Sequence, residues 1–295
     1  PRKGKRLWNH ASLGQGPAAS GAHRWSFTSV LRPRLIFYRI TINYIRIHHF
    51  PSLGNSMNAV EVKGLVKSYG QFQAVKGISF DVREGEVYGL IGPNGAGKTT
   101  TFRVLSTLLE VTSGSVMVHG IDLKERPDEV RKVISYLPED AGAYKHLRGR
   151  EYLRFIAEFF AEGEKADELV ARGMEIANLG ERIDDKVDTY SKGMARRLLV
   201  ARALMIRPRL AILDELTSGL DVLNAREIRR TVKAYAAQGT TMLLSSHNML
   251  EVEMLCDRIA LINDGLIVAE GTPADLKRRY DAQNIEDVFV KVVSG

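Results

Sequence analysis

One glycine-rich loop, lying between an apolar run and a helical pattern, constrains this chain more than any other feature. Val87–Ile91 is apolar without alternation, which is typical of a strand covered on both faces, and Lys98–Leu109 has the apolar spacing of a helix. The loop between them fits the pattern G-x-x-x-x-G-K-[ST]. Its residues are Gly92, Pro93, Asn94, Gly95, Ala96, Gly97, Lys98 and Thr99. We call residues 92–99 the phosphate loop, because glycines in this arrangement let backbone N–H groups converge on phosphate oxygens.

The side chains at the end of the phosphate loop have separate expected tasks. Lys98 is expected to reach the β- and γ-phosphates of ATP, and the Thr99 hydroxyl is expected to ligate Mg²⁺. Thr100 adds a further expected nucleotide contact at the start of the helix, whose positive N-terminus faces the same anion. The alternative interpretation is a structural glycine-rich turn, which the flanking strand and helix disfavour.

A second candidate site element follows the buried run Leu210–Leu213. Asp214 comes directly after this run, where an acidic side chain can meet the phosphate loop from a neighbouring strand and hold Mg²⁺ through its water shell. Glu215 is next and can act as general base towards the attacking water. The alternative is that the two acidic residues only begin a solvated loop.

Short apolar runs alternate with helical patterns along the rest of the chain. The further strand-like runs are Val60–Val66, Gly77–Val82, Thr241–Ser245 and Ile259–Ile262. Helical patterns such as Ala225–Ala237 separate the later runs, which predicts a doubly wound α/β fold with a mostly parallel sheet. The turn Asn263-Asp264-Gly265 predicts a hairpin at the end of that sheet.

Residues from about 140 to 206 lack a convincing strand pattern. Glu151–Phe160, Lys165–Asn178 and Lys192–Ile206 have helical spacing instead, so this stretch is interpreted as a helical insertion in the α/β core. The expected organisation is a leader over residues 1–56, a nucleotide-binding domain over residues 57–272 and a short C-terminal extension over residues 273–295.

The positive charge of the chain is confined to the leader. Nine of the 42 Lys and Arg residues lie in residues 1–56, which contain no Asp or Glu. The rest of the chain therefore has 33 basic and 35 acidic residues and is close to neutral. The formal net charge of +7 therefore predicts no basic patch on the folded body, and no nucleic-acid partner is expected. The leader is interpreted as upstream sequence outside the native protein, or alternatively as an Arg-rich targeting arm, and is expected to be poorly ordered.

The sequence predicts neither a membrane span nor a disulfide. The stretch of residues 35–47 is shorter than the roughly 18 apolar residues that a span needs, and it carries Arg39 and Arg46. Work at a membrane would therefore require a second polypeptide that supplies the span. The single cysteine, Cys256, lies on the apolar side of a helical pattern, which favours a buried thiol and a reducing compartment.

A third motif, Tyr190–Leu204, begins Tyr-Ser-Lys-Gly-Met and stands shortly before Asp214. With this segment, most of the chain from Val60 to Thr272 resembles the nucleotide-binding subunit of ATP-binding-cassette (ABC) transporters. The resemblance implies a P-loop NTPase core with a mainly parallel sheet, an N-terminal antiparallel β subdomain and a helical signature subdomain. Ser191 can cap a helix, and the resemblance implies that Ser191 and Gly193 contact the γ-phosphate of ATP held by a partner subunit. An ordinary helix cap is the alternative for Ser191.

Three more residues match the family in order. Asp221, in Ser218-Gly-Leu-Asp, resembles the loop that bridges the two sites of a dimer. His247 matches the histidine that senses the γ-phosphate, and the family places an aromatic that stacks on adenine at Tyr69. An inert histidine and a core tyrosine are the respective alternatives.

The chain also departs from the usual family pattern. Glu139 stands where a glutamine is common, and its carboxylate can still coordinate Mg²⁺. Lys192 and Met194 replace a glycine and the glutamine of the signature, and Leu216 replaces a common proline. These variants and the tail Asn284–Phe289 together resemble the ATPase subunits of ABC-2-type exporters.

The resemblance implies a Mg²⁺-dependent ATPase that dimerises on ATP with a second copy or a paired ATPase subunit. It would drive a separate transmembrane permease from the cytoplasmic face of the membrane. The alternative is a soluble ABC ATPase that acts on nucleic acid or ribosomes. The distance from Lys98 to Ser191 leaves no room for the long coiled coil of chromosome-type members, and ribosome-acting members usually carry two cassettes. No Asn-Lys-x-Asp motif points to GTP.

Overall fold

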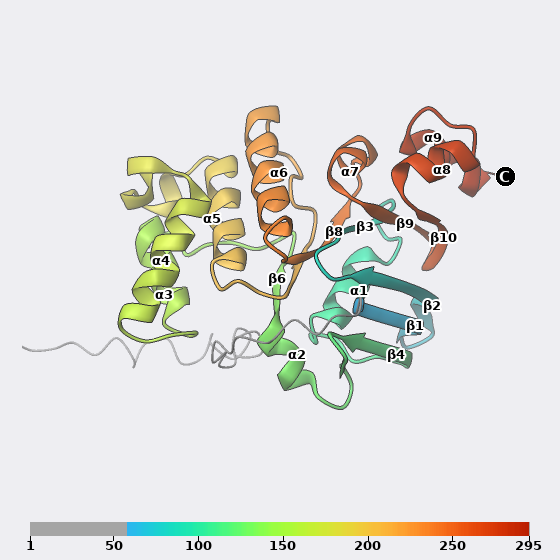
Figure 1. Ribbon diagram of the computed structural model, residues 1–295, viewed down its shortest axis with the longest axis horizontal. Coiled ribbons are helices and arrows are strands. Elements are labelled where there is room, and N and C mark those ends of the chain that lie inside the picture. The colour runs from blue at the N-terminus through green and yellow to red at the C-terminus, as the bar shows by residue number, and fades with distance from the viewer. Residues whose placement is uncertain (1–57, 295) are drawn as a thin grey trace, which may run out of the picture. The chain divides into compact units, whose positions relative to one another are not determined.

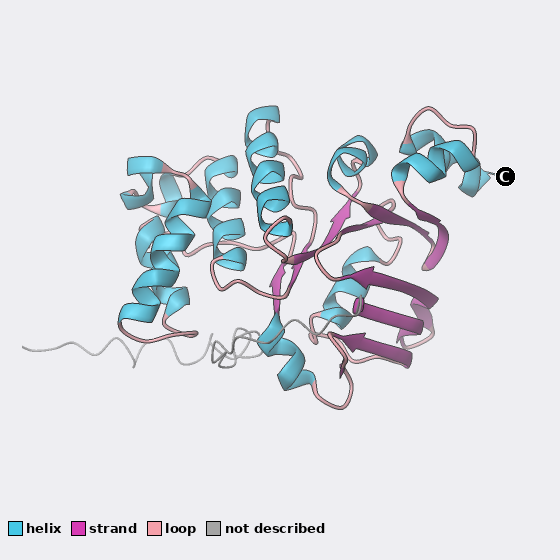
Figure 2. Ribbon diagram, viewed as in Figure 1, coloured by secondary structure: helices cyan, strands magenta, loops and turns pink. Residues whose placement is uncertain are grey.

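The computed structural model describes residues 58–294, and the expectations for the leader lie outside this range. Its strands form two sheets, which Figure 2 shows in magenta: an antiparallel sheet of order β2-β1-β4-β5 and a six-stranded sheet of order β10-β9-β3-β8-β7-β6. The α/β fold class with an N-terminal antiparallel subdomain is therefore confirmed.

The antiparallel sheet consists of β1 (Asn58–Tyr69), β2 (Phe72–Arg83), β4 (Ser113–Val118) and β5 (Ile121–Asp122). β1 and β2 form a hairpin in which Tyr69 pairs with Phe72 at the tip. β4 pairs with the other edge of β1, and the sequence did not predict it. Its first three residues are exposed, so neither a continuous apolar run nor a clean alternation marks it.

The six-stranded sheet contains five parallel strands. They are β3 (Val87–Ile91), β6 (Ile134–Leu137), β7 (Leu210–Leu213), β8 (Thr241–Ser246) and β9 (Arg258–Asn263). β10 (Leu266–Gly271) turns back antiparallel to β9, as the hairpin signal predicted. Every residue of β3, β6, β7 and β8 is buried, as strands covered on both faces require.

Two hydrophobic clusters cover the two faces of this sheet. On β3, Tyr88 and Leu90 belong to the cluster shared with the antiparallel sheet. Val87 and Ile91, which point the other way, belong to the cluster shared with the helical insertion. The central strands are thus held from both sides, which gives the residues at their carboxyl ends a rigid support.

The helical insertion contains α3 (Gly149–Ala157), α4 (Glu164–Ala177) and α5 (Lys192–Leu204), with 3₁₀ turns at Gly180–Asp184 and Val187–Thr189. In Figure 1 these helices gather beside the β6 edge of the sheet. The remaining helices are α1 (Lys98–Leu105), α2 (Pro127–Val133), α6 (Val222–Ala236), α7 (Met249–Leu255), α8 (Pro273–Arg279) and α9 (Ile285–Ser294). Within residues 58–294 no helix is both long and apolar enough to cross a bilayer.

Two local findings qualify the sequence expectations. α1 ends at Leu105 rather than Leu109, because Thr107 adopts a left-handed φ of 61° and Leu108 and Leu109 donate back to the carbonyl of Arg103. The C-terminal residues join the main core, since Leu276, Ile285 and Val288 are fully buried in the cluster that also covers β3.

Cys256 is buried as expected, and burial raises the pKa of its thiol, so it stays protonated.

Candidate nucleotide-binding and hydrolysis site

Three neighbouring parallel strands end at one edge of the sheet and bring the candidate residues together. The phosphate loop follows β3, Asp214 and Glu215 follow β7, and His247 follows β8, which lies between those two strands. The carboxyl ends of parallel strands are the usual location of ligand sites in open α/β sheets. Residues far apart in the sequence therefore meet here.

Glycine is required at two positions of the phosphate loop. A Cβ on Gly92 would overlap the carbonyl oxygen of Ile262 on β9. Gly97 has a φ of 108°, and a Cβ there would lie 2.7 Å from the carbonyl oxygen of Ala74. The loop is therefore packed closely against β9 and the antiparallel sheet, while its middle residues 93–95 are exposed.

Lys98 lies beneath its own loop. Its Nζ donates to the carbonyl oxygens of Gly92 at 2.7 Å and Pro93 at 3.2 Å. It also lies 3.2 Å from Oε1 of Glu215, and the two side chains are only 5% and 4% exposed. The ammonium group is thus already positioned among the groups that would surround a phosphate.

Asp214 is fully buried at the carboxyl end of β7. The Ser245 hydroxyl on β8 donates to its Oδ1 and accepts from the backbone N–H of Glu215 at 2.9 Å. Burial raises the pKa of Asp214, an effect that the Ser245 hydrogen bond and the nearby Thr99 hydroxyl oppose. Its Oδ2 has no hydrogen-bond partner among residues 58–294. A buried carboxylate oxygen beside a threonine hydroxyl fits a Mg²⁺ ion.

Glu215 is held in an unusual backbone conformation. Its φ is 47°, in the left-handed region that residues other than glycine rarely adopt. Its Oε2 lies 2.7 Å from Nδ1 of His247, whose side chain is half exposed. Such strain persists only where surrounding contacts impose it, and it is common at functional sites. Lys98, Glu215 and His247 therefore form one connected chain of side chains.

The signature residues lie on other elements of the same chain. Ser191 caps α5 by accepting from the backbone N–H of Met194 at 3.2 Å, as its position predicted. A Cβ on Gly193 would overlap the side chain of Asn224 on α6. Asp221 caps α6 by accepting from the N–H of Asn224 at 2.9 Å and is exposed. The structure gives Ser191, Gly193 and Asp221 no hydrogen bond to the phosphate loop within residues 58–294.

The remaining predicted residues, Tyr69 and Glu139, are both exposed. Tyr69 is 46% exposed at the tip of the β1–β2 hairpin, with the Lys67 ammonium 5.5 Å from the centre of its ring. It is not a core tyrosine. Glu139 is exposed just after β6, and its pocket of about 220 Å³ is shared with Lys192 and Glu215.

Sequence reasoning missed two residues that support the site. Ser245 is a buried polar residue that follows the apolar residues Met242–Leu244 of β8, and Arg196 is a charged residue on the buried side of α5. A buried polar residue in an apolar pattern is the signal that could have identified both.

Comparison with known proteins assigns the class. The family model for the ABC transporter matches residues 75–218. The linearmycin resistance ATP-binding protein LnrL of Bacillus subtilis (strain 168) is 38% identical over 237 residues, which cover 80% of this chain and 76% of that protein. The daunorubicin/doxorubicin resistance ATP-binding protein DrrA of Streptomyces peucetius is 40% identical over 237 residues, 77% of this chain and 72% of that protein.

Solved structures agree with this assignment. An ATP-binding subunit of an ABC transporter superposes with a TM-score of 0.71 at 29% identity, over 80% of this chain and 99% of that one. A dimeric ATP-binding cassette in a post-hydrolysis state, bound to ADP and Pi, superposes with a TM-score of 0.65 at 25% identity, over 72% of this chain and 98% of that one. The chain belongs to the ATP-binding proteins of ABC transporters. It is an ABC ATPase, the subunit that binds and hydrolyses ATP for a transporter.

Proposed function

We propose that this chain hydrolyses Mg·ATP at a site completed by a second cassette and thereby drives an exporter of drug-like molecules. The observation that carries the proposal is the connected set of Lys98, Glu215 and His247 at the carboxyl ends of three parallel strands. The names of two relatives, which refer to resistance to linearmycin and to daunorubicin and doxorubicin, support the class of cargo.

Each side chain has a role in this proposal. Lys98 binds the β- and γ-phosphates, with backbone contacts from Gly92 to Gly97 and Thr100 at the start of α1. Thr99, Asp214 and Glu139 would hold Mg²⁺, which would neutralise charge that develops on the phosphate oxygens. Glu215 accepts the proton of the attacking water, and His247 holds Glu215 and senses the γ-phosphate. Tyr69 offers an exposed ring for adenine to stack on.

The second cassette supplies the signature. Ser191 and Lys192 are exposed at the N-terminus of α5, where backbone N–H groups and the helix dipole favour an anion. Ser191 and Gly193 would contact the γ-phosphate in the opposing site, and Asp221 would contact the opposing loop. A relative of known structure is a dimer with ADP and Pi, which supports a dimer of this chain or a pair with a related ATPase.

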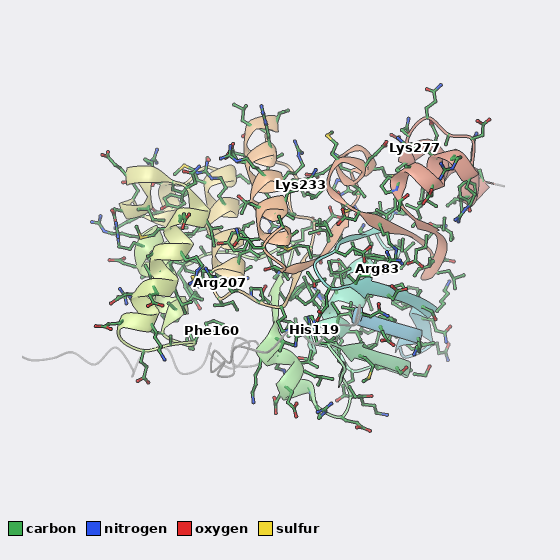
Figure 3. All side chains as sticks on the ribbon, viewed as in Figure 1. Arg83, His119, Phe160, Arg207, Lys233 and Lys277 are labelled. Carbon is green, nitrogen blue, oxygen red and sulfur yellow. The ribbon has the colours of Figure 1, made fainter. Side chains whose placement is uncertain are left out.

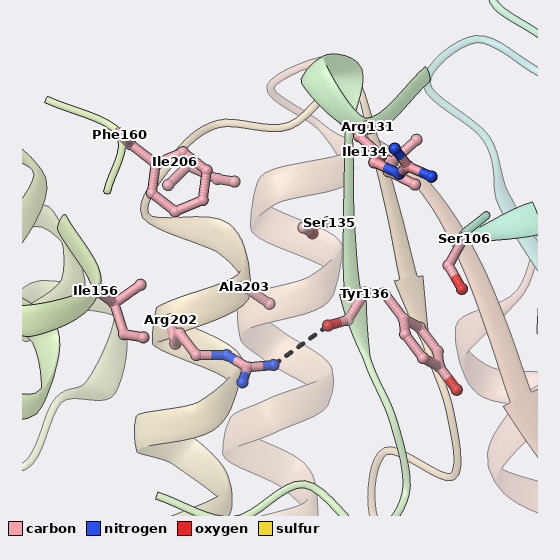
Figure 4. A pocket seen from close by; sticks show the side chains of 10 residues that line it. All are labelled: Ser106, Arg131, Ile134, Ser135, Tyr136, Ile156, Phe160, Arg202, Ala203 and Ile206. Atoms are coloured by element: carbon pink, nitrogen blue, oxygen red, sulfur yellow. Dashed lines mark hydrogen bonds between the residues drawn. The ribbon is translucent and has the colours of Figure 1, made fainter. Parts of the chain in front are cut away.

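The permease is proposed to dock where the helical insertion meets the core. A cavity of about 60 Å³ lies between Tyr136 on β6 and Ile156 and Phe160 of the insertion (Figure 4). Arg202 borders it and donates to the carbonyl oxygen of Tyr136 at 3.2 Å. The Ser135 hydroxyl, which belongs to the lining of this cavity, is buried without a hydrogen-bond partner within residues 58–294. Because a cavity of this size holds only a few water molecules, it could take one apolar side chain of a docked membrane subunit but not a helix or loop.

An aromatic cluster extends this docking face towards the loop after β6. Tyr144 contacts Tyr152 and Phe155 edge to face, with ring centres 6.1 and 5.5 Å apart, and Phe155 contacts Phe159 in the same way at 5.1 Å. Because Glu139 begins the same loop, a permease bound here could respond to the nucleotide site. The chain would thus lie at the cytoplasmic face of the membrane as a peripheral subunit, with residues 57–272 as its nucleotide-binding domain.

Glu215→Gln tests the proposed chemistry. It should lower turnover at least about a hundredfold and trap an ATP-bound dimer, measured by phosphate release and by size-exclusion chromatography with Mg·ATP. Undiminished turnover would remove Glu215 as the base. Purification of the intact chain from membranes tests the partner: a polytopic protein should co-purify, whereas ribosomes or DNA in its place would overturn the transporter proposal.

A further inference from the structure

Arg196 is the most heavily bonded side chain of the signature helix and has no role in the proposed chemistry above. It lies on α5, about one helical turn after Gly193, and is 8% exposed. Among residues 58–294, its guanidinium group donates only to backbone carbonyl oxygens. The acceptors are Leu216 from Nε at 2.9 Å, Pro138 and Glu139 from Nη1 at 3.3 Å each, and Asp214 at 2.7 Å and Glu215 at 3.0 Å from Nη2.

These contacts use the full donor capacity of the side chain. An arginine carries five N–H groups in a rigid planar fork, and five carbonyl oxygens accept from Arg196. A lysine could not span the same acceptors, because its donors diverge from one point. The arrangement therefore depends on the shape of guanidinium and not only on its charge.

The acceptors lie on the two turns that carry candidate site residues. Three are consecutive and include Glu215, whose left-handed φ requires external support. The other two are Pro138 and Glu139, at the start of the loop that leads to the proposed docking face. Arg196 thus connects the helix capped by Ser191 to both turns through one rigid group.

We propose that Arg196 is a positioning residue that holds the Glu215 turn and the Glu139 turn in register with the signature helix. The inference deepens the proposed function and rests on it, because it takes Glu215 as the base and α5 as the element that meets the second cassette. A rotation of the helical insertion would move the guanidinium, and the guanidinium would move the backbone of Glu215. ATP bound at the site that this signature helix completes could in this way change the position of Glu215 in the other site.

Arg197 provides a matched control on the same helix. Its guanidinium also donates to carbonyl oxygens, those of Ala177 and Asn178 at the end of α4. These contacts stay inside the helical insertion and touch neither catalytic turn. Loss of Arg197 should therefore weaken packing between α4 and α5 without moving Glu215.

The first experiment measures ATPase activity of the full chain against ATP concentration for Arg196→Gln, Arg196→Lys and Arg197→Gln. Arg196→Gln should lower kcat by about 10- to 100-fold with the KM for ATP within about twofold, because misplacing a catalytic group affects the chemical step. Arg196→Lys should recover only a small part. Arg197→Gln should keep kcat within about twofold, even if its melting temperature falls by as much as that of Arg196→Gln. Equal kcat losses in the two glutamine variants would overturn the proposal.

A double-mutant cycle separates positioning from general damage. If Arg196 acts through Glu215, adding Arg196→Gln to Glu215→Gln should lower the residual kcat no further. If the double variant loses kcat by the product of the two single losses, the proposal is overturned. Normal turnover of Glu215→Gln alone would instead refute the assignment of the base. If Arg196→Gln does not fold, as judged by its thermal unfolding, Arg196→Lys takes its place in the cycle and is judged by the same outcomes.

Discussion

Nζ of Lys98 lies 3.2 Å from Oε1 of Glu215, and both side chains are almost completely buried. The cation proposed to bind phosphate is therefore paired with the carboxylate proposed to act as base. A buried ion pair is costly to break by removing one partner, because the other charge remains desolvated. Binding of a phosphate must compete with Glu215 for Lys98, and this competition yields the first prediction.

Glu215→Gln should bind ADP more tightly than the unaltered chain. The neutral amide holds Lys98 less strongly and repels phosphate less, so the Kd for ADP should fall by about three- to tenfold, or about 1 kcal/mol. Calorimetric titration without Mg²⁺, at a concentration where the chain is monomeric, measures it. His247→Ala is the control, because it keeps the charges of both Lys98 and Glu215 and ADP has no γ-phosphate for His247 to sense. An unchanged Kd for Glu215→Gln would contradict the competition.

Asp214→Asn should stabilise the metal-free protein while abolishing its activity. Burial raises the pKa of Asp214, so the folded state binds the proton more tightly than the unfolded state. The charged form therefore weakens folding at neutral pH, and this penalty disappears as the pH falls through the raised pKa. The neutral amide should increase the free energy of unfolding by about 1 kcal/mol, measured by urea denaturation in EDTA.

Ser245→Ala provides the opposing control for that measurement. It removes the donor to Asp214 and the acceptor of the Glu215 N–H, so the free energy of unfolding should fall by about 1–2 kcal/mol. A loss of stability in Asp214→Asn would show that the buried carboxylate is stabilising without metal.

Tyr69→Ala should raise the KM for ATP by about 5- to 20-fold, because stacking of a base on an aromatic ring contributes about 1–3 kcal/mol. Tyr69→Trp should retain affinity, and kcat should change little in either variant. Phe72→Ala is the matched control, since Phe72 pairs with Tyr69 across the hairpin and is also exposed. Steady-state ATPase kinetics measure these effects. A raised KM in Phe72→Ala alone would transfer the stacking role to that ring.

His119 should make the stability of the protein depend on pH. Its side chain is buried at the β4–β5 turn, labelled in Figure 3, with Nδ1 3.0 Å from Oε1 of Glu84. Burial, followed by the charge of Arg209, lowers the pKa of His119 below 6.5 despite the opposing effect of Glu84. The folded state thus binds this proton less tightly than the unfolded state, so stability declines as the pH falls through 6.5 towards the lowered value.

Chemical denaturation between about pH 7.5 and about pH 5.5 measures this dependence. The range stays above the pKa of Glu84, which its contacts with His119 and Arg209 lower from 4.5 against the effect of burial. His119→Gln should flatten the decline in unfolding free energy. An equally steep decline in that variant would assign it to another group.

Some elements were predictable from local pattern alone. Leu210–Leu213 and the hairpin at Asn263–Gly265 were found where the sequence placed them. The apolar run is too short for a helix and alternates with helical patterns, and an Asn-Asp-Gly turn strongly favours a hairpin. β4 was not predicted, since its exposed first half has no periodic signal, and the early end of α1 depends on the backbone of Thr107.

The sequence by itself determined the phosphate loop, the acidic pair after β7 and the order of the motifs, because the chemistry of phosphate binding demands those residue types in contiguous segments. Only the tertiary structure decided that Lys98 pairs with Glu215, that Ser245 links Asp214 to Glu215, and that Arg196 joins two catalytic turns. The reason is physical: each of these contacts joins segments distant in the chain, and strand order and burial determine which of them meet.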